Sequence, residues 1–299
     1  MDHTLRIAAL DAGFFANFNN VISVLSTSLG KDGARAARVD WTVRPNMTDF
    51  TYGDVGTNVW ARFFEPLRFD ELPAAETDAP IFPDYSISNI YAYRLYKRDR
   101  LWRGRLHEVF DRFVRPLPHV KARVDSIAKS SFGGAKVIGV HARHPGISVE
   151  NLFDVPPAPA FVASTRRLLG PDPGGKVFLA TDTAATATFF QDAFGDRLVV
   201  QADVERTRGT TQVHHDSAAS EQRALQVLTD ALLLARCDAL VHVTSNIATA
   251  VGYINPHLEM HFCESRPRAV IGNAVAAMMR VRAVGHGIRA LRRAKYGPR

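Results

Sequence analysis

The stretch GGAKVIGVHARHPG, residues 133–146, decides the fold of the second half of the chain. Its apolar run Val137–Val140 predicts a buried strand that leads into His141, Arg143 and His144, just before a Pro-Gly turn. In α/β proteins, ligands bind where the strands of a parallel sheet end. We therefore expect these three polar side chains to line a binding site.

From this stretch onward, strand patterns alternate with helix patterns. Strands joined by helices of this length lie parallel to one another, with right-handed crossovers. This half is therefore predicted to be a doubly wound α/β domain. The expected strands lie at residues 136–143, 176–182, 197–203 and 239–245, and the expected helices at residues 158–170, 183–194, 220–237 and 246–255.

The first half of the chain begins with a strand-and-helix pattern of the same kind. Residues 5–30 predict a short strand, a turn at Gly13 and a helix, and a second strand follows at residues 38–43. Further along, Pro116 and Pro118 should separate two basic helices. We therefore expect a second, less regular Rossmann-like domain.

Three parts are expected in the chain. The small residues at positions 130–134 are typical of a linker and mark the boundary between the first two parts. The three parts are an N-terminal domain at residues 1–130, a C-terminal domain at residues 131–266 and a basic amphipathic helix at residues 267–299. The helix has apolar residues at helical spacing, which predicts that it packs across the protein. Contact with nucleic acid or with a membrane surface remains open as an alternative.

Composition predicts a folded protein of the cytoplasm, with peripheral contact at the inner membrane left open. Hydrophobic residues make up 46% of the chain, but each apolar run is shorter than the roughly 20 residues that a membrane helix needs. The N-terminal residues do not show the pattern of a signal peptide. Cys237 and Cys263 lack the spacing of metal ligands, so we expect two buried, reduced thiols. The net charge of +7 favours an acidic partner, such as nucleic acid, an anionic membrane or a phosphorylated small molecule.

Polar residues follow each predicted strand of the second half. Because parallel strands end at the same edge of a sheet, these residues should converge on one crevice. The candidates are, strand by strand, His141, Arg143 and His144, then Asp182 and Thr183, then Asp203 and Arg206, and finally Thr244, Ser245 and Asn246.

This set of side chains suits a nucleoside diphosphate. Arg143 presents a planar fork of donors that fits phosphate oxygens. Thr244, Ser245 and Asn246 open a helix, where hydroxyls and N–H groups bind anions, although they could equally form an ordinary N-cap. The Asp182 carboxylate could accept hydrogen bonds from the N–H groups of a base or the hydroxyls of a sugar. It could equally cap the helix that follows its strand.

A metal ion is not expected. His214 and His215 are adjacent in a polar segment and lack the spacing of helical ligand pairs. No Asp-x-Asp pair follows a strand, where it would hold a divalent ion on a diphosphate.

Several of these segments resemble motifs of the fucosyltransferase superfamily that includes the Nod-factor and core α-1,6-fucosyltransferases and the protein O-fucosyltransferases. VIGVHARHPG (137–146) resembles the family's GVHVRRTD motif, and KVFLATDT (176–183) its FLATDD segment. Residues 227–256 resemble a family motif in which a helix with an aspartate is followed by a strand, two serines and a second helix. GFFANFNN (13–20) is similar to the GGxGNQ element with which the first domain of these enzymes begins. The resemblance implies the GT-B fold, in which two Rossmann-like doubly wound domains face each other across a cleft.

The resemblance also implies roles for individual residues. Arg143 corresponds to the arginine at the β-phosphate of the donor, and His141 to the histidine beside the nucleotide. Asp182 corresponds to the acidic residue after the second strand, Asp230 to the helical aspartate that contacts guanine, and Ser245 to the serine near the diphosphate. Two residues of the first domain would line the same cleft, Gly13 and Asn17, with Asn19 as a further candidate.

Three positions depart from the family pattern. The second arginine is His144 here, the second aspartate is Thr183 and the second serine is Asn246. Loss of one arginine should weaken the diphosphate site by about 1–3 kcal/mol unless another group replaces it. Arg206, Arg208 or a protonated His144 is a candidate replacement.

The sequence thus predicts a metal-independent, inverting glycosyltransferase that moves a sugar, fucose from GDP-fucose, to a hydroxyl of a bacterial glycan or glycoconjugate. The expected partners are this GDP-sugar donor and the glycan acceptor, and no further cofactor is expected. Candidates for the catalytic base are Asp54, Asp11 and His144. Two alternatives remain: a non-catalytic GT-B-like protein that binds a nucleotide sugar or glycan, and a nucleic-acid-binding protein that acts through its basic tail.

Overall fold

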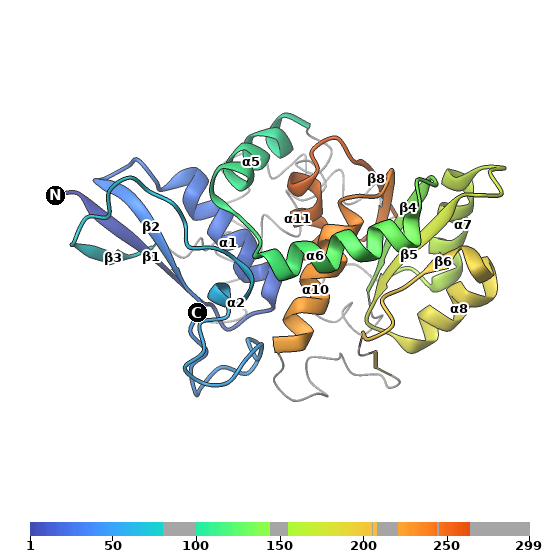
Figure 1. Ribbon diagram of the computed structural model, residues 1–299, viewed down its shortest axis with the longest axis horizontal. Coiled ribbons are helices and arrows are strands. Elements are labelled where there is room, and N and C mark those ends of the chain that lie inside the picture. The colour runs from blue at the N-terminus through green and yellow to red at the C-terminus, as the bar shows by residue number, and fades with distance from the viewer. Residues whose placement is uncertain (80–99, 144–154, 205, 208–220, 244, 264–299) are drawn as a thin grey trace, which may run out of the picture.

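Two parallel β-sheets and the helices around them make up the computed structural model (Figure 1). The structure describes residues 1–79, 100–143, 155–204, 206–207, 221–243 and 245–263. Of the features expected from the sequence, His144, Thr244, Arg208, the pair His214 and His215, and the helix at residues 267–299 lie outside the described residues.

The larger sheet has five parallel strands in the order β6-β5-β4-β7-β8. The chain runs outward from the central strand β4 through β5 to β6 and then returns to the other side of β4 for β7 and β8. The sheet is therefore doubly wound, as predicted, and its winding reverses between β4 and β7. The strands are β4 (Val137–Ala142), β5 (Lys176–Thr181), β6 (Leu198–Val199), β7 (Ala239–His242) and β8 (Glu259–Phe262).

Helices cover both faces of this sheet. Phe161 of α7 (Ala158–Leu169) and Phe190 of α8 (Ala184–Phe194) pack with Val140 in one apolar cluster. The helices α10 (Glu221–Leu234) and α11 (Asn246–Ile254) belong to a second cluster with side chains from the opposite face. The predicted strand and helix order of this half is confirmed, but β6 is shorter than expected and β8 was not anticipated.

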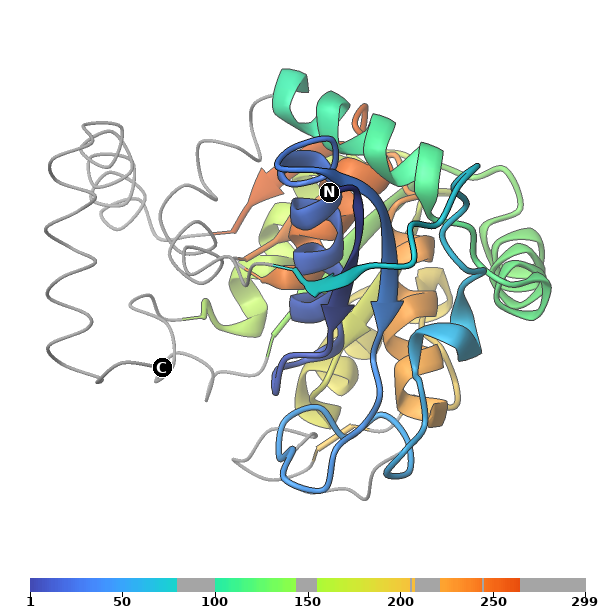
Figure 2. The same cartoon turned by 90° about the vertical axis from the view of Figure 1, so that its left-hand side faces the viewer.

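The smaller sheet has three parallel strands among the described residues, in the order β2-β1-β3. The strands are β1 (His3–Ala8), β2 (Ala34–Asp40) and β3 (Glu76–Asp78). Helix α1 (Phe14–Thr27) lies beside this sheet (Figure 2), so the predicted strand-turn-helix start is confirmed. The second strand ends earlier than expected, and Trp41 leads into a loop before the short helix α2 (Trp60–Phe63).

Two helices then lead into the larger sheet. The helices α5 (Arg100–Phe113) and α6 (Pro118–Ile127) are separate, as the prolines predict, with Pro118 in the first turn of α6. A π-helical turn, η2 (Ala128–Phe132), ends α6, and Gly133 follows in the left-handed region at φ 58° before β4 begins. Glycine adopts this conformation without the steric cost that other residues carry. The domain boundary at residues 130–134 stays a prediction.

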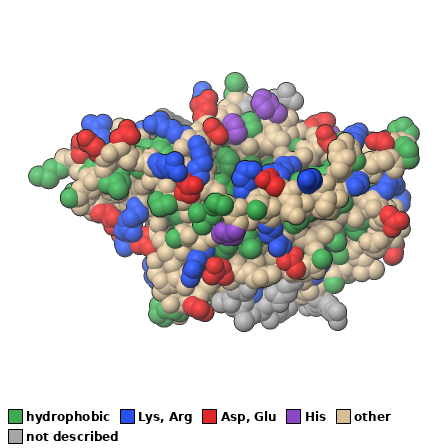
Figure 3. Space-filling view, in the orientation of Figure 1, with side chains coloured by type: hydrophobic (Ala, Val, Ile, Leu, Met, Phe, Trp, Pro, Cys, Tyr) green, Lys and Arg blue, Asp and Glu red, His purple; other side chains and the backbone are tan. Residues whose placement is uncertain are grey.

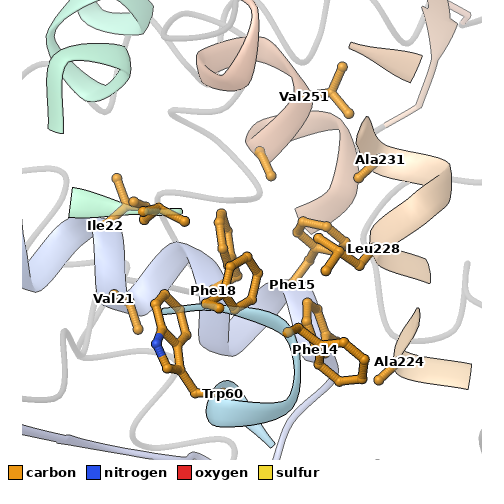
Figure 4. Packing of buried hydrophobic residues seen from close by; sticks show 14 of the residues in the cluster. Phe14, Phe15, Phe18, Val21, Ile22, Trp60, Ala224, Leu228, Ala231 and Val251 are labelled. Carbon is orange, nitrogen blue, oxygen red and sulfur yellow. The ribbon is translucent and has the colours of Figure 1, made fainter. Parts of the chain in front are cut away.

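One apolar core joins the two halves of the chain. Phe14, Phe15 and Phe18 of α1 belong to one buried cluster with Leu228 of α10 and Val251 of α11, and Figure 4 shows Phe15 beside Leu228. The ring of Phe18 also stacks on that of Tyr253, with centroids 6.4 Å apart. Because burial of aromatic and aliphatic side chains is the main favourable contribution to folding, this packing holds the two sheets in a fixed relation.

Two further findings concern composition. Both cysteines are buried and free, as predicted. In the described part of the chain, no helix has the length and apolar character needed to cross a membrane.

Replacing Leu228 with alanine tests the shared core. The side chain is fully buried, at 0% exposure, so Leu228→Ala should lower the free energy of unfolding by about 2–5 kcal/mol. Leu72→Ala is the matched control, because Leu72 is 66% exposed and its truncation should change little. Urea denaturation of the three proteins measures the difference, and equal losses in both variants would contradict a core at this position.

Candidate functional site

The ends of β4 and β7 lie side by side where the winding of the larger sheet reverses. His141 of β4 is the register partner of His242 of β7, and both side chains are buried. Arg143 follows β4 and Ser245 follows β7, so the two predicted groups come from neighbouring strand ends. Such a reversal point is where open α/β sheets bind their ligands.

Arg143 and Asp182 each place one buried polar atom near the ends of β4 and β5. Both side chains are half-buried. Neither Nε of Arg143 nor Oδ1 of Asp182 has a hydrogen-bond partner among the described residues. Because a buried polar atom without a partner costs free energy, both groups are suited to gain a partner when a ligand binds.

Ser245 and Asn246 form the start of α11. The Ser245 hydroxyl accepts a hydrogen bond from the N–H of Ala248 at 3.1 Å, which makes Ser245 the N-cap of this helix. Ser245 therefore forms the ordinary N-cap that was one of the two expectations for these residues. Ligand contact by Ser245 or Asn246 stays a prediction.

Asn19 ties this helix start to the first half of the chain. Its Nδ2 donates to the carbonyl oxygen of Asn246 at 3.1 Å, and its Oδ1 accepts from the Tyr253 hydroxyl at 2.7 Å. At the other end of α11, Nη1 of Arg103 donates to the carbonyl of Leu258 at 2.9 Å. The first half thus positions α11, a long-range role for Asn19 that sequence reasoning had not assigned.

Asn17 shapes the turn that precedes α1. Its Oδ1 accepts from the N–H of Leu10 at 2.6 Å, and its Nδ2 donates to the carbonyls of Leu10 and Ala12 at 3.1 and 3.0 Å. The side chain is buried. These bonds fix the turn that contains Gly13, and contact of Gly13 or Asn17 with a ligand stays a prediction.

The two candidate bases of the first half differ in their surroundings. Burial acts to raise the pKa of Asp11, but hydrogen bonds from the N–H groups of Thr48, Asp49 and Phe50 outweigh it and lower the pKa. Asp11 therefore organises this loop, and its lowered pKa makes it a weaker base, while its catalytic role stays a prediction. Asp54 is exposed, and its side chain makes no hydrogen bond or ion pair with a described residue.

Asp230 lies in a polar network that joins α10, α6 and the segment after β6, and that reaches the surface at Asp203. Oδ1 of Asp230 accepts from Nε2 of Gln201 at 2.5 Å. Nη2 of Arg206 donates to the carbonyl of Gln201 at 3.2 Å. Nη2 of Arg123 donates to Oε1 of Gln201 at 3.0 Å and to the carboxylate of Asp203 at 2.7 and 2.8 Å. Sequence reasoning missed Gln201 and Arg123, since neither belongs to a recognisable motif.

The pKa of Asp230 is raised by its surroundings. The residue as a whole is half-buried, but its carboxyl group is buried, and this raises the pKa of Asp230 to about 7. The hydrogen bond from Gln201 and the charge of Arg206 act in the opposite direction and lower this pKa. Burial also lowers the pKa of Arg206. Asp230 therefore changes its charge near neutral pH.

This pKa predicts how stability depends on pH. The folded state holds the proton of Asp230 more tightly than the unfolded state, so the residue favours folding most below about pH 4, and the contribution is lost as pH rises through about 7. Between pH 5 and pH 8, the wild type should lose stability relative to Asp230→Asn. Urea denaturation at both pH values tests this, with Asp192→Asn, an exposed aspartate of α8, as the control. Parallel pH profiles of the wild type and Asp230→Asn would contradict the raised pKa.

Basic side chains do not form a single patch on the face shown in Figure 3. Lysine and arginine side chains there are interspersed with aspartate and glutamate. The nucleic-acid alternative rests on residues 267–299, which lie outside the described residues. In the described segments, no group of three His, Cys, Asp or Glu residues could hold a metal ion, and metal independence stays a prediction.

Comparison with known proteins assigns the chain to a family. The sequence model of the family "Nodulation protein Z (NodZ)" matches residues 101–254, which include Arg143, Asp182, Asp230 and Ser245. The chain belongs to the NodZ family. Nodulation protein Z of Bradyrhizobium diazoefficiens is 27% identical over an alignment of 147 positions that covers 45% of this chain and 38% of that protein. The chain thus spans 38% of the length of this curated relative.

Solved structures extend the likeness of this NodZ-family chain to its fold. A crystal structure of NodZ α-1,6-fucosyltransferase soaked with GDP-fucose matches with a TM-score of 0.53 and 16% identity, over 85% of this chain and 93% of that one. Fucosyltransferase NodZ from Bradyrhizobium matches with a TM-score of 0.53 and 17% identity, over 84% and 92%. POFUT1 in complex with GDP matches with a TM-score of 0.50 and 10% identity, over 88% and 99%. The predicted GT-B fold of the fucosyltransferase superfamily is confirmed.

Proposed function

We propose that this chain is a metal-independent, inverting glycosyltransferase that moves fucose from GDP-fucose to a hydroxyl of a bacterial glycan or glycoconjugate. The observation that carries the proposal is the position of Arg143, half-buried after β4 at the point where the sheet reverses, with its Nε unsatisfied among the described residues. Membership of the NodZ family supports the donor, since a NodZ structure was soaked with GDP-fucose. A cytoplasmic location belongs to the same proposal.

The donor would bind across the ends of β4, β5 and β7. Arg143 would hold the β-phosphate, with Ser245 and the first turn of α11 beside it. His141 would lie next to the nucleotide, and Asp182 would accept hydrogen bonds from the sugar or base. Asp230 would accept from the N–H groups of guanine, for which its carboxyl must be charged.

In the reaction, the acceptor oxygen attacks the anomeric carbon of fucose as the bond from this carbon to the phosphate oxygen breaks. Attack from the opposite side inverts the anomeric configuration. The departing GDP carries the developing negative charge, so Arg143 lowers the barrier by stabilising that charge. The acceptor proton passes to a base, for which Asp54 and His144 remain the proposed candidates.

Arg143→Ala tests the phosphate role. Loss of one key electrostatic donor lowers turnover by about a hundredfold or more, so we expect a loss of that size in a fucosyl-transfer or donor-hydrolysis assay. Arg166→Ala is the control, because Arg166 is an exposed arginine of α7. Full activity of Arg143→Ala would rule out the assignment.

Thermal stability in the presence of nucleotides tests the donor. A ligand that binds only the folded state raises its stability by about 2.7 kcal/mol at a hundredfold excess over the dissociation constant. With EDTA present, GDP should raise the melting temperature clearly more than UDP, ADP or CMP does. A preference for UDP would contradict the GDP-sugar donor, and a shift that requires added Mg²⁺ would contradict metal independence.

A non-catalytic role in nucleotide-sugar binding is the second candidate, and Thr183 favours it. Where the family motif has a second aspartate, Thr183 is buried as the N-cap residue of α8, with its hydroxyl 3.4 Å from that of Thr181. A position that carries a charge in the family motif is thus part of the packing here. Calorimetric binding of GDP without any hydrolysis or transfer of the donor would identify this second function.

A further inference from the structure

Arg123 of α6 binds a side chain in the segment that follows β6 of the larger sheet. Helix α6 packs against α10, and in Figure 1 it crosses in front of that helix. Nη2 of Arg123 donates to Oε1 of Gln201 at 3.0 Å and to both carboxylate oxygens of Asp203, at 2.7 and 2.8 Å. The Arg123 side chain is 26% exposed and Gln201 is 2% exposed, so water competes little for the bond between them.

The partners of Gln201 fix which way its amide points. Oε1 faces the guanidinium of Arg123, which can only donate hydrogen bonds. Nε2 donates to the carbonyl oxygen of Gln226 at 3.1 Å and to Oδ1 of Asp230 at 2.5 Å. A flipped amide would place N–H groups against the guanidinium and its oxygen against two acceptors. Arg123 therefore keeps the Gln201 N–H groups directed at Asp230.

This amide in turn orients the carboxyl group of Asp230. The last torsion of an aspartate side chain is broad, so a hydrogen bond to one oxygen decides how the group turns. Oδ1 is taken by Gln201, and Oδ2 makes no hydrogen bond with a described residue. Burial raises the pKa of Asp230, and the bond from Gln201 acts against it, which favours the charged carboxylate. Gln201 thus leaves Asp230 oriented and with one oxygen for a ligand.

We propose that Arg123 and Gln201 are positioning residues for base selection: Arg123 orients the Gln201 amide, and this amide orients the Asp230 carboxyl that receives the guanine N–H groups. The inference rests on the proposed function, because it concerns the base of the GDP donor. Both residues act through Asp230 and need no contact with the donor. Through α6, the first half of the chain takes part in choosing the nucleotide.

Arg123→Met tests the proposal, because it keeps the apolar stem and removes the guanidinium that orients Gln201. Adenine lacks the N1–H and the 2-amino group of guanine, so the ratio of the ADP to the GDP dissociation constant reports base selection. This ratio should fall about fivefold, as for the loss of one hydrogen bond, with ADP binding within about twofold of wild type. Isothermal titration calorimetry measures both constants. Gln201→Leu removes the amide itself and should lower the ratio in the same way.

Arg236→Met is the matched control. Arg236 follows α10 and also forms an ion pair with α6, through Asp125. Its side chain is 39% exposed, and it makes no hydrogen bond to Gln201 among the described residues. The variant therefore loosens the same helix without touching the Gln201 amide. The ratio of the two dissociation constants should stay at its wild-type value.

A double-mutant cycle shows whether Arg123 acts through Asp230. In an Asp230→Asn background, Arg123→Met should cause no further loss of GDP affinity, because the carboxylate is already gone. A full further loss there, equal losses for GDP and ADP, or an unchanged ratio in Arg123→Met would overturn the positioning role, while a wild-type preference for GDP upholds the proposed function. Absence of that preference in the wild type would overturn the GDP donor and this inference together.

Discussion

The packing of α1 against α10 and α11 is the constraint on which the rest of this structure depends. It places Phe18 on Tyr253 and lets Asn19 hold both the Tyr253 hydroxyl and the carbonyl of Asn246. Because the aromatic rings are buried around these bonds, the polar contacts are shielded from water and strengthened. The position of α11, and with it the Ser245 end of the candidate site, is therefore set by residues of α1, in the first half of the chain.

The candidate site combines groups that act in two different ways. Arg143 and Asp182 hold buried atoms that lack partners among the described residues, so a ligand would satisfy them. Asp230 is already satisfied by Gln201, and burial raises its pKa to about 7. In the proposed function, Arg143 would meet the phosphate end of the nucleotide and Asp230 its base, and under that proposal donor affinity would depend on pH near 7.

Residues at the ends of regular strands could be predicted from the sequence. His141 and Arg143 follow an apolar run, and their place at a sheet edge follows from strand periodicity and parallel topology alone. Asn17 and Asp11 could not be assigned in this way, because their polar groups are used by turns and loops that local pattern does not specify. Gln201 and Arg123 could not be found either, since each hydrogen-bonds to residues far along the chain.

Periodicity and short-range turn chemistry were enough to predict the doubly wound sheet, the strand-turn-helix start and the polar residues at the strand ends. How the two halves meet, and that Asn19 positions α11, could be seen only once the chain was folded. The physical reason is that these contacts join residues from different elements. Their geometry follows from how the aromatic core packs, and core packing depends on all its side chains at once.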